Sequence, residues 1–298
     1  MDTTAAMREE AVPDAEVPTG APRPTSRANV ATGVRGRRQS PLLRIRGELG
    51  LGWKIALGAL GVAVFITIWA VKARMMNNRS VLPSPAATWS ALLELRTNGV
   101  LTTDLWASMQ RVLIGYSISV AIGVVIGVAI GTFASVEAYF EAQIGFLRYI
   151  PATALTPVFL LLLGLDEAPK LWLIIIGTVF FNILMIADVA RAVPRELLNA
   201  SYTLGAGRIT VLHRVILRHS VPGIIDVARI NLAAAWLMLV VAEILAADKG
   251  LAYQVVRAQR FRAVDKMFAI LLVFGLIGLV SDVILRWARN VSSPWARP

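Results

Sequence analysis

Six runs of apolar residues, each long enough to cross a bilayer, restrict this chain to the folds of membrane proteins. The runs cover residues 55–71, 108–133, 142–163, 170–190, 222–246 and 267–287. A helix needs about 20 mainly apolar residues to cross the hydrocarbon core. Hydrophobic residues make up 56% of the 298 residues, above the roughly 45–50% that is usual in soluble domains. We therefore predict an all-α membrane protein with about six transmembrane helices.

The N-terminal region differs in composition from the rest of the chain. Residues 1–45 are rich in Ala, Pro, Thr, Arg and acidic residues and show no apolar period, which is typical of disordered segments. The first apolar run begins near Ile55, too far along the chain for a cleaved signal peptide, so we interpret it as an uncleaved anchor. We predict two parts, a disordered cytoplasmic tail over 1–45 and a transmembrane domain over 46–298.

The net charge of +11 lies mainly in tails and loops around the apolar runs. Six spans place both termini on one side, which then receives 17 of the 30 Lys and Arg residues, whereas the other side receives ten. Because cytoplasmic loops carry the excess of basic residues, both termini are expected in the cytoplasm. We attribute the charge to this orientation, and expect no nucleic-acid partner.

The second and third runs carry opposite packing signals. Small residues recur every fourth position in the second run, at Gly115, Ser119, Gly123, Gly127 and Gly131. This stripe predicts close backbone contact with another helix. The third run contains Pro151 and Pro157, which should bend or break its helix. A broken helix at membrane depth lies against protein or a water-filled cavity, so the break indicates either a transport pathway or a packing kink.

Polar and ionisable side chains in the spans are candidates for a pathway, because they are costly in lipid. The candidates for the pathway or a gate are Arg148, Pro151, Pro157, Asn182, Arg229 and Glu243. Arg148 has the alternative of reaching the inner membrane surface. Asp226 and Arg229, three residues apart, can pair on one helix face. Glu243 has no basic residue three or four positions away in its own helix, so it is either solvated at the interface or lines an outer mouth.

Two other carboxylates, Asp188 and Asp282, lie near the expected inner ends of their helices, where we expect them to be solvated.

The sequence offers no residues for covalent or metal chemistry. There is no cysteine, and the only two histidines, His213 and His219, have no carboxylate at a matching spacing. No G-x-x-x-x-G-K-[ST] phosphate loop is present. We therefore expect no enzyme activity and no cofactor in this chain. Uphill transport would take its energy from an ion gradient or from another subunit.

A polar and basic segment separates the fourth and fifth runs, within a loop over about 191–221. "PRELLNASYTL" predicts a short helix that ends at Gly205, since glycine favours the left-handed conformation at helix ends. "GRITVLHRVILRHS" predicts a second, amphipathic helix, after which Pro222 should begin the next span. Composition alone favours binding of this segment to anionic lipid.

The same loop resembles a motif of the permeases of bacterial ABC importers: E-A-A, three residues, G, nine residues, I-x-L-P. Here Asn199-Ala200-Ser201 precede Gly205 by the same three residues, and nine residues later the chain reads Val215-Ile216-Leu217-Arg218. Asn199, Ser201 and Arg218 depart from the motif. The chain resembles the nitrate/sulfonate/taurine branch through further segments, namely "LPSPAATWSALLEL", "SMQRVLIGY", "RYIPATALTPVFLLLLG", "VPGIIDVARINLAAAWLMLVVAEILAADKGLAY" and "GLIGLVSD". Where the branch usually reads G-L-G, this chain has Gly250-Leu251-Ala252.

The resemblance implies a type I importer permease fold and a set of partners. The partners are a second permease copy, two ATPase subunits that hold ATP and Mg, an extracytoplasmic solute-binding protein and membrane lipid. The loop would be the coupling helix that docks on an ATPase, and its candidate residues are Glu196, Asn199, Ala200, Ser201, Gly205 and Arg208. The implied solute is a small, generally anionic molecule such as nitrate, taurine, a sulfonate or bicarbonate. The alternative is a gradient-driven transporter or channel without an ATPase.

Overall fold

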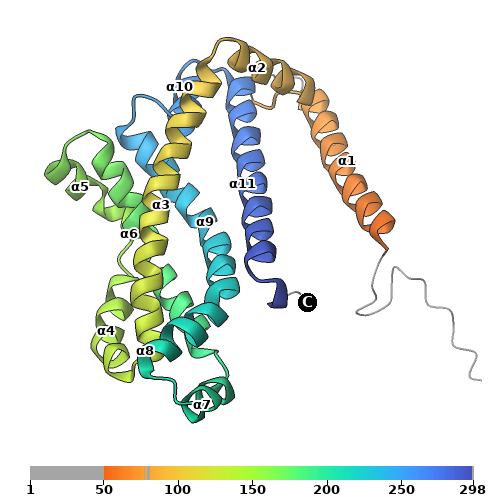
Figure 1. Cartoon of the computed structure of the whole chain (residues 1–298). Helices are drawn as coiled ribbons and strands as arrows, with labels where there is room; N and C mark the ends of the chain where they lie inside the picture. The colour runs from red at the N-terminus through yellow and green to blue at the C-terminus, as the bar shows by residue number, and fades with distance from the viewer. Residues whose placement is uncertain (1–49, 77, 79–80, 297–298) are drawn as a thin grey trace, which may run out of the picture. The chain divides into compact units, whose positions relative to one another are not determined.

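The computed structural model describes residues 50–76, 78 and 81–296, and every regular element in them is helical. The first elements are α1 (Leu51–Met76), α2 (Pro85–Thr97), α3 (Val100–Thr132), α4 (Ala134–Leu147), η1 (Ala152–Leu155), α5 (Thr156–Leu163) and α6 (Glu167–Arg191). The later elements are α7 (Arg195–Thr203), α8 (Arg208–Thr210), η2 (Val211–Leu217), α9 (Arg218–Ala246), α10 (Leu251–Arg260), α11 (Val264–Ser292) and η3 (Pro294–Ala296). The predicted tail over 1–45 lies outside the described residues (Figure 1).

The chain divides into two units, residues 1–59 and residues 60–298. Of the first unit, the structure describes Gly50 and the first nine residues of α1. α1 is apolar between Lys54 near its start and Lys72 and Arg74 near its end, and Ala73 is its only buried residue. The second unit contains the remaining helices, and its packing is described below.

The centre of the second unit is the packing of α3 against α6 through the predicted stripe of small residues. A Cβ atom added to Gly123 would lie 2.8 Å from the Cβ of Asn182, and one added to Gly127 would lie 2.6 Å from the carbonyl oxygen of Ile183. Gly131 comes equally close to the backbone of Ala187. Residue numbers rise together along both helices at these contacts, so α3 and α6 run parallel.

Two parallel neighbours need a return crossing between them, and α4, η1 and α5 supply it. α4 and the η1–α5 segment meet at a bend of 76°. α4 has 14 residues and is about 21 Å long, too short to cross the hydrocarbon core of about 30 Å. Figure 1 shows α4 beside the end of α3 and α5 farther back toward the start of α6. The predicted break is confirmed, and the third crossing is a pair of short helices rather than one helix.

The third crossing breaks where the prolines lie. Pro151 precedes η1, and Pro157 lies in the first turn of α5, where a missing backbone N–H costs nothing. Ala152 in η1 packs beside Gly177, near the middle of α6. The η1 side of the break therefore lies beside the middle of α6.

The fifth crossing begins earlier than predicted. α8, η2 and α9 form one continuous helix, Arg208–Ala246, so Pro222 lies inside this helix and does not begin it. Upstream of the proline, the residues of η2 form a π-helix, Val211–Leu217. Prolines within membrane helices are tolerated because local π adjustments and neighbouring helices satisfy the freed backbone groups. The amphipathic helix is thus the first part of a span rather than a separate element.

The second crossing also begins earlier than predicted, at Val100 instead of residue 108. This first part of α3 contains the buried residue Asp104. A search for apolar runs did not detect this part of the helix because it contains polar residues. The helix nevertheless continues through them, since its backbone hydrogen bonds do not depend on apolar side chains.

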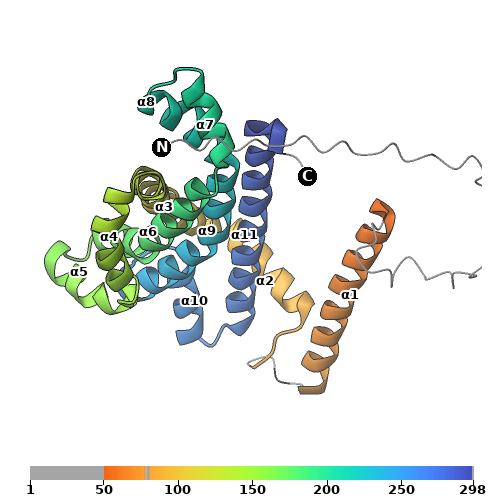
Figure 2. The same cartoon turned by 90° about the horizontal axis from the view of Figure 1, so that it is seen from below.

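α9 and α11 are antiparallel neighbours on the side of α6 opposite α4 and α5 (Figure 2). Trp236 and Phe274 meet edge to face between them, with ring centroids 6.0 Å apart. α10 packs on α11 and α9, and α2 packs on α11. The bundle thus has two ends: the Glu243 end, where α9 meets α10, and the Gly205 end, which carries α7.

Candidate functional site

α7 is a short projecting helix whose end is fixed by Gly205. The N–H of Ala206 donates to the carbonyl of Ser201 at 3.0 Å, and the N–H of Gly205 donates to that of Tyr202 at 2.9 Å. Gly205 has a φ of +81°. These are the two bonds and the left-handed residue of a Schellman cap, which satisfies the last carbonyls of a helix. Only glycine takes this conformation without strain, which explains the position of Gly205.

The predicted coupling residues all lie on this loop and face away from the bundle. Glu196, Asn199, Ala200, Gly205 and Arg208 are exposed, and Ser201 is half-buried. Large apolar side chains of the same loop are exposed too, with Leu204 at 87% and Ile209 at 76% of their surface. Apolar side chains that project this far mark a protein–protein or membrane contact. The loop therefore presents a surface that this chain alone leaves uncovered.

Glu243 lies at the opposite end and is fully buried. Its carboxylate accepts hydrogen bonds from Ser108 Oγ at 2.6 Å and from the Arg111 guanidinium at 2.8 Å, both from α3. It also accepts the N–H of Ala252 at 2.9 Å. The expectation of a solvated Glu243 is therefore wrong. The absence of a partner in its own helix predicted nothing, because the partner comes from another helix.

Arg111 connects Glu243 to a second carboxylate. It donates to Glu167, the first residue of α6, through two nitrogens at 2.6 and 2.7 Å, and to the carbonyl of Lys249 at 2.7 Å. Lys170, 3% exposed, donates to Glu167 at 3.0 Å. The cluster combines two acids with two bases. Paired and hydrogen-bonded charges of this kind are the form in which charge is tolerated inside a protein.

The same cluster holds the turn between α9 and α10. Asp104 accepts the N–H of Gly250 at 2.7 Å, and Ser108 Oγ accepts the N–H of Leu251 at 2.9 Å. Gly250 has a φ of +135°, and an added Cβ there would collide with the Glu243 carboxylate. Ala252, where the branch usually has glycine, takes part through its N–H alone, so the departure leaves the turn intact. Below, the Glu243 cluster denotes Asp104, Ser108, Arg111, Glu167, Lys170 and Glu243.

Most of the Glu243 cluster was missed from the sequence. Asp104 and Glu167 lie just outside the predicted spans, and Arg111 stood alone in an apolar run. No spacing rule joins residues more than 130 positions apart. The one available signal was the excess of unpaired charges near the same predicted side of the membrane, Arg111, Lys170 and Glu243.

Asn182 belongs to a buried polar chain across the middle of the bundle. Its amide donates to Ser119 Oγ at 2.9 Å, and Asn231 of α9 donates to Asn182 Oδ1 at 2.8 Å. Thr178 also donates to Ser119 Oγ, at 2.7 Å. Buried hydrogen bonds between spans hold helices together in lipid. In this chain Asn182 joins α3, α6 and α9 and is closed to solvent.

Arg229 lies in an alternating row of ion pairs between α9 and α11. It pairs with Asp226 at 3.5 Å, as predicted, and with Asp282 at 3.0 Å. Asp282 also pairs with Arg286, and Asp226 with Arg289. Asp282 was expected to be solvated; its side chain is 34% exposed, and it also pairs with Arg229 because α11 packs beside α9. Asp188 is largely exposed, as expected, and pairs with Arg191.

Arg148 lies at the break between α4 and η1. It is exposed, its guanidinium lies 4.7 Å from the centroid of the Tyr149 ring, and among the described residues it forms no ion pair. Pro151 and Pro157 are exposed next to it. The structure therefore brings Arg148 and the two prolines together, apart from Glu243 and from Arg229.

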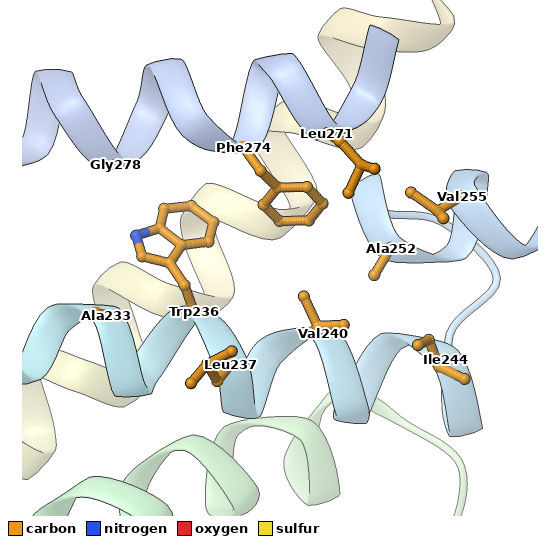
Figure 3. Close-up of a pocket in the computed structure, with 10 residues that line it drawn as sticks. All are labelled: Ala233, Trp236, Leu237, Val240, Ile244, Ala252, Val255, Leu271, Phe274 and Gly278. Carbon is orange, nitrogen blue, oxygen red and sulfur yellow. The ribbon is translucent and has the colours of Figure 1, made fainter. Parts of the chain in front are cut away.

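A cleft of about 390 Å³ opens between α9, α10 and α11 (Figure 3). Trp236, Val240, Leu271 and Phe274 are among the side chains that line it. Every lining side chain is apolar apart from the indole nitrogen of Trp236, which is buried without a partner. The cleft carries no charge and cannot hold an anion by electrostatics.

Residues 119–290 match the family model described as "Binding-protein-dependent transport system inner membrane component". A probable ABC transporter permease of Brucella melitensis is 32% identical over 246 residues, which cover 83% of this chain and 98% of that protein. A putative aliphatic sulfonates transport permease of Bacillus subtilis is 30% identical, over 84% of this chain and 90% of its own. The taurine transport system permease of Escherichia coli is 29% identical, over 85% and 94%.

The fold is also that of a solved importer. An inward-facing structure of the MetNI methionine ABC transporter aligns with a TM-score of 0.59 at 17% identity and covers 66% of this chain and 98% of its own. Three findings indicate the same family. The fold is a helical bundle, the family model matches more than half of the residues, and the relatives align over most of both chains. This chain therefore belongs to the inner-membrane permease components of binding-protein-dependent ABC transport systems.

Proposed function

We propose that this chain forms, as a homodimer on two ATPase subunits, the transmembrane pathway for a small organic anion of the sulfonate or taurine class. As a permease subunit of an ABC importer it is a multi-pass inner-membrane protein that is not itself catalytic and carries no cofactor. Permeases of this family act with ATPase and binding-protein partners. The relatives named for sulfonates and taurine support the solute class. Family membership sets aside the gradient-driven alternative.

The environment of Arg148 is the observation that supports an anionic solute. An arginine at bilayer depth costs about 2.5–3.5 kcal/mol on insertion scales, so it faces protein, water or a counter-ion. Arg148 is exposed beside a broken helix, and it lines a cavity of about 270 Å³ together with Glu137, Glu141 and Asp188, none of which forms a direct ion pair with it. In the proposed dimer it faces the pathway, where a passing sulfonate or carboxylate is its counter-ion.

The experiment for the solute class is uptake by the importer with Arg148→Gln. We expect uptake of an alkanesulfonate or taurine to fall at least tenfold, because the counter-ion for the solute is lost. Arg96→Gln, an exposed arginine on α2 and outside both the pathway and the ATPase contact, is the matched control. Unchanged uptake by the Arg148 variant would show that Arg148 does not contact the solute in the pathway. The ligand of the partner binding protein then identifies the solute among nitrate, taurine, sulfonates and bicarbonate.

For coupling, we propose that the Gly205 end lies in the cytoplasm, together with both termini, and that α7 docks in a cleft of the ATPase. The exposed apolar side chains of the loop and the rigid Schellman cap support this role. Asn199 carries no charge, so any ion pair to the ATPase comes from Glu196. Gly205, Asn199, Ala200, Ser201 and Arg208 then form the contact.

The test of coupling is Gly205→Asp or Gly205→Pro. Each variant should remain in the membrane and lose uptake while ATP hydrolysis continues, because neither residue takes a φ of +81° easily and the cap opens. Gly207→Ala is the control, since Gly207 has a φ of −74° and open space around its Cβ position. Normal uptake by both Gly205 variants would refute the proposed role of α7 in coupling.

A further inference from the structure

A basic pocket at the Gly205 end is not explained by transport or coupling. It has a volume of about 300 Å³ and lies where α7, η2, the first turn of α9 and η3 meet. Its lining residues are Leu197, Ser201, Arg214, Val215, Arg218, His219 and Trp295. Two arginines, a histidine and no carboxylate line one cavity, so it carries positive charge without an internal counter-ion.

The cations of this pocket differ from the other basic residues at the same end. Arg191, Arg229, Arg286 and Arg289 each pair with an aspartate. Among the described residues, Arg214, Arg218 and His219 form no ion pair or hydrogen bond through their side chains. Arg218 instead lies over the Trp295 ring, 5.6 Å from its centroid. Unpaired cations in a concave site attract anions more strongly than cations on a flat surface.

The cations of the pocket lie on η2 and on the first turn of α9. Arg214 belongs to the π-helical segment Val211–Leu217, and Arg218 and His219 follow it directly at the start of α9. All three line the same pocket. The pocket therefore lies at the junction between the π-helical segment and the regular helix of the fifth crossing.

We propose that this pocket binds the phosphate group of an anionic phospholipid. The spans α3, α6, α9 and α11 all end at this side of the bundle, so the pocket lies at the level of the headgroups. Basic pockets between transmembrane helices bind lipid headgroups, and tryptophan is enriched at this interface. Leu197 and Val215 supply apolar walls for the glycerol and upper acyl region.

A bound phosphate would connect three moving parts of the permease. Arg214 and Arg218 belong to the helix of the fifth crossing, Ser201 and Leu197 to α7, and Trp295 to the C-terminal segment. One anion between them reduces the repulsion of the cations and holds α7 against the base of the fifth span. Anionic lipid should then stiffen the connection through which α7 moves the span.

The experiment uses the intact importer, with its ATPase subunits, in bilayer discs. Discs of phosphatidylcholine with 20–30% phosphatidylglycerol are compared with pure phosphatidylcholine, and retained lipid is counted by native mass spectrometry. We expect retention of phosphatidylglycerol to fall about tenfold in Arg214→Gln/Arg218→Gln. Arg191→Gln/Arg286→Gln removes the same charge at the same end, outside the pocket and outside the proposed ATPase contact, and should retain the lipid. Arg214→Lys/Arg218→Lys, which keeps the charge, should retain most of it.

Free inorganic phosphate distinguishes the source of the ligand. If phosphate at millimolar concentration displaces phosphatidylglycerol both from the native protein and from the Arg191/Arg286 control variant, the same pocket holds both ligands. If phosphate binds and phosphatidylglycerol does not, the ligand is soluble and the lipid proposal is wrong. If both double glutamine variants lost lipid equally, the lipid would be attracted by the overall positive charge of this end rather than by the pocket, and the proposal would be wrong. Loss of the ATPase from the Arg214/Arg218 variant would assign these cations to the ATPase contact instead, and would also overturn it.

Discussion

At the two ends of the helix bundle, the Glu243 cluster and the region of α7 with the basic pocket treat their charged residues in opposite ways. At the Glu243 end, Arg111, Glu167, Lys170 and Glu243 pair with one another from three different helices, and most of them are buried. At the Gly205 end, α7 and the basic pocket leave their cations and large apolar side chains exposed. The first end is complete within one chain, whereas the second lacks the groups that would cover it.

The difference agrees with the roles proposed for the two ends. A buried ion cluster fixes the α9–α10 turn in one geometry, because breaking any contact leaves a buried charge without a partner. An end that docks on other molecules keeps unpaired groups, since interface energy comes from surfaces that the free subunit leaves open. The Glu243 cluster should therefore govern the stability of the permease, and the Gly205 end its coupling.

The largest effect on stability is expected from Arg111→Met. Glu243 then loses its charged partner in a buried site, and the loss of one partner of a buried ion pair costs about 3–5 kcal/mol. Thermal unfolding of the purified importer measures the loss. Lys266→Met, which removes the exposed pair with Glu94, is the control at the same end and should cost less than about 1 kcal/mol. Equal losses in the two variants would show that the Glu243 cluster is no more important than a surface ion pair.

Next in size is Gly127→Ala in the contact of α3 with α6. Its Cβ would lie 2.6 Å from the carbonyl oxygen of Ile183, a backbone atom that cannot move alone. Overpacking of this kind costs about 1–3 kcal/mol. Gly145→Ala in α4 meets no atom within 4 Å and should gain up to about 1 kcal/mol from helix propensity. Opposite signs in thermal unfolding are expected, and destabilisation by Gly145→Ala would contradict the packing.

A smaller effect on stability is expected from Gly205→Ala. A left-handed φ costs a non-glycine residue about 1–2 kcal/mol, and the loss should be confined to the end of α7. Hydrogen exchange of residues 195–206 should accelerate while α3 and α6 keep their protection. If hydrogen exchange accelerated equally throughout the bundle, α7 would be part of the packed core rather than a projecting helix.

The smallest effect on stability is expected from charge reversal at Arg257, Arg260 and Arg262 near α10. Arg257 and Arg260 are exposed, so the change in unfolding free energy should stay within about 0.5 kcal/mol for each. If this basic surface receives the binding protein, uptake at low solute concentration should fall and the effect should shrink at high salt. Unchanged uptake kinetics would remove this surface from the docking site.

Much of the fold could be predicted from local patterns. The stripe from Gly115 to Gly131 predicted a close helix contact, and the structure confirms it and identifies α6 as the partner. Pro151 correctly predicted a break, and Gly205 correctly ended α7. Pro222 was misleading, because the effect of a proline depends on whether a π-helical segment precedes it. The Glu243 cluster was not predicted because its members belong to helices far apart in the sequence.

The sequence by itself determined that the chain spans the membrane about six times, where its helices approach closely, and which loop resembles a coupling helix. These properties depend on hydropathy, residue size and backbone preference, which act locally. Only the tertiary structure decided that Glu243 is buried against Arg111, that α3 and α6 run parallel, and that Arg214, Arg218 and His219 share one pocket. Such properties depend on which helices become neighbours, and in lipid that choice rests on packing and on the pairing of scarce polar groups rather than on hydrophobicity.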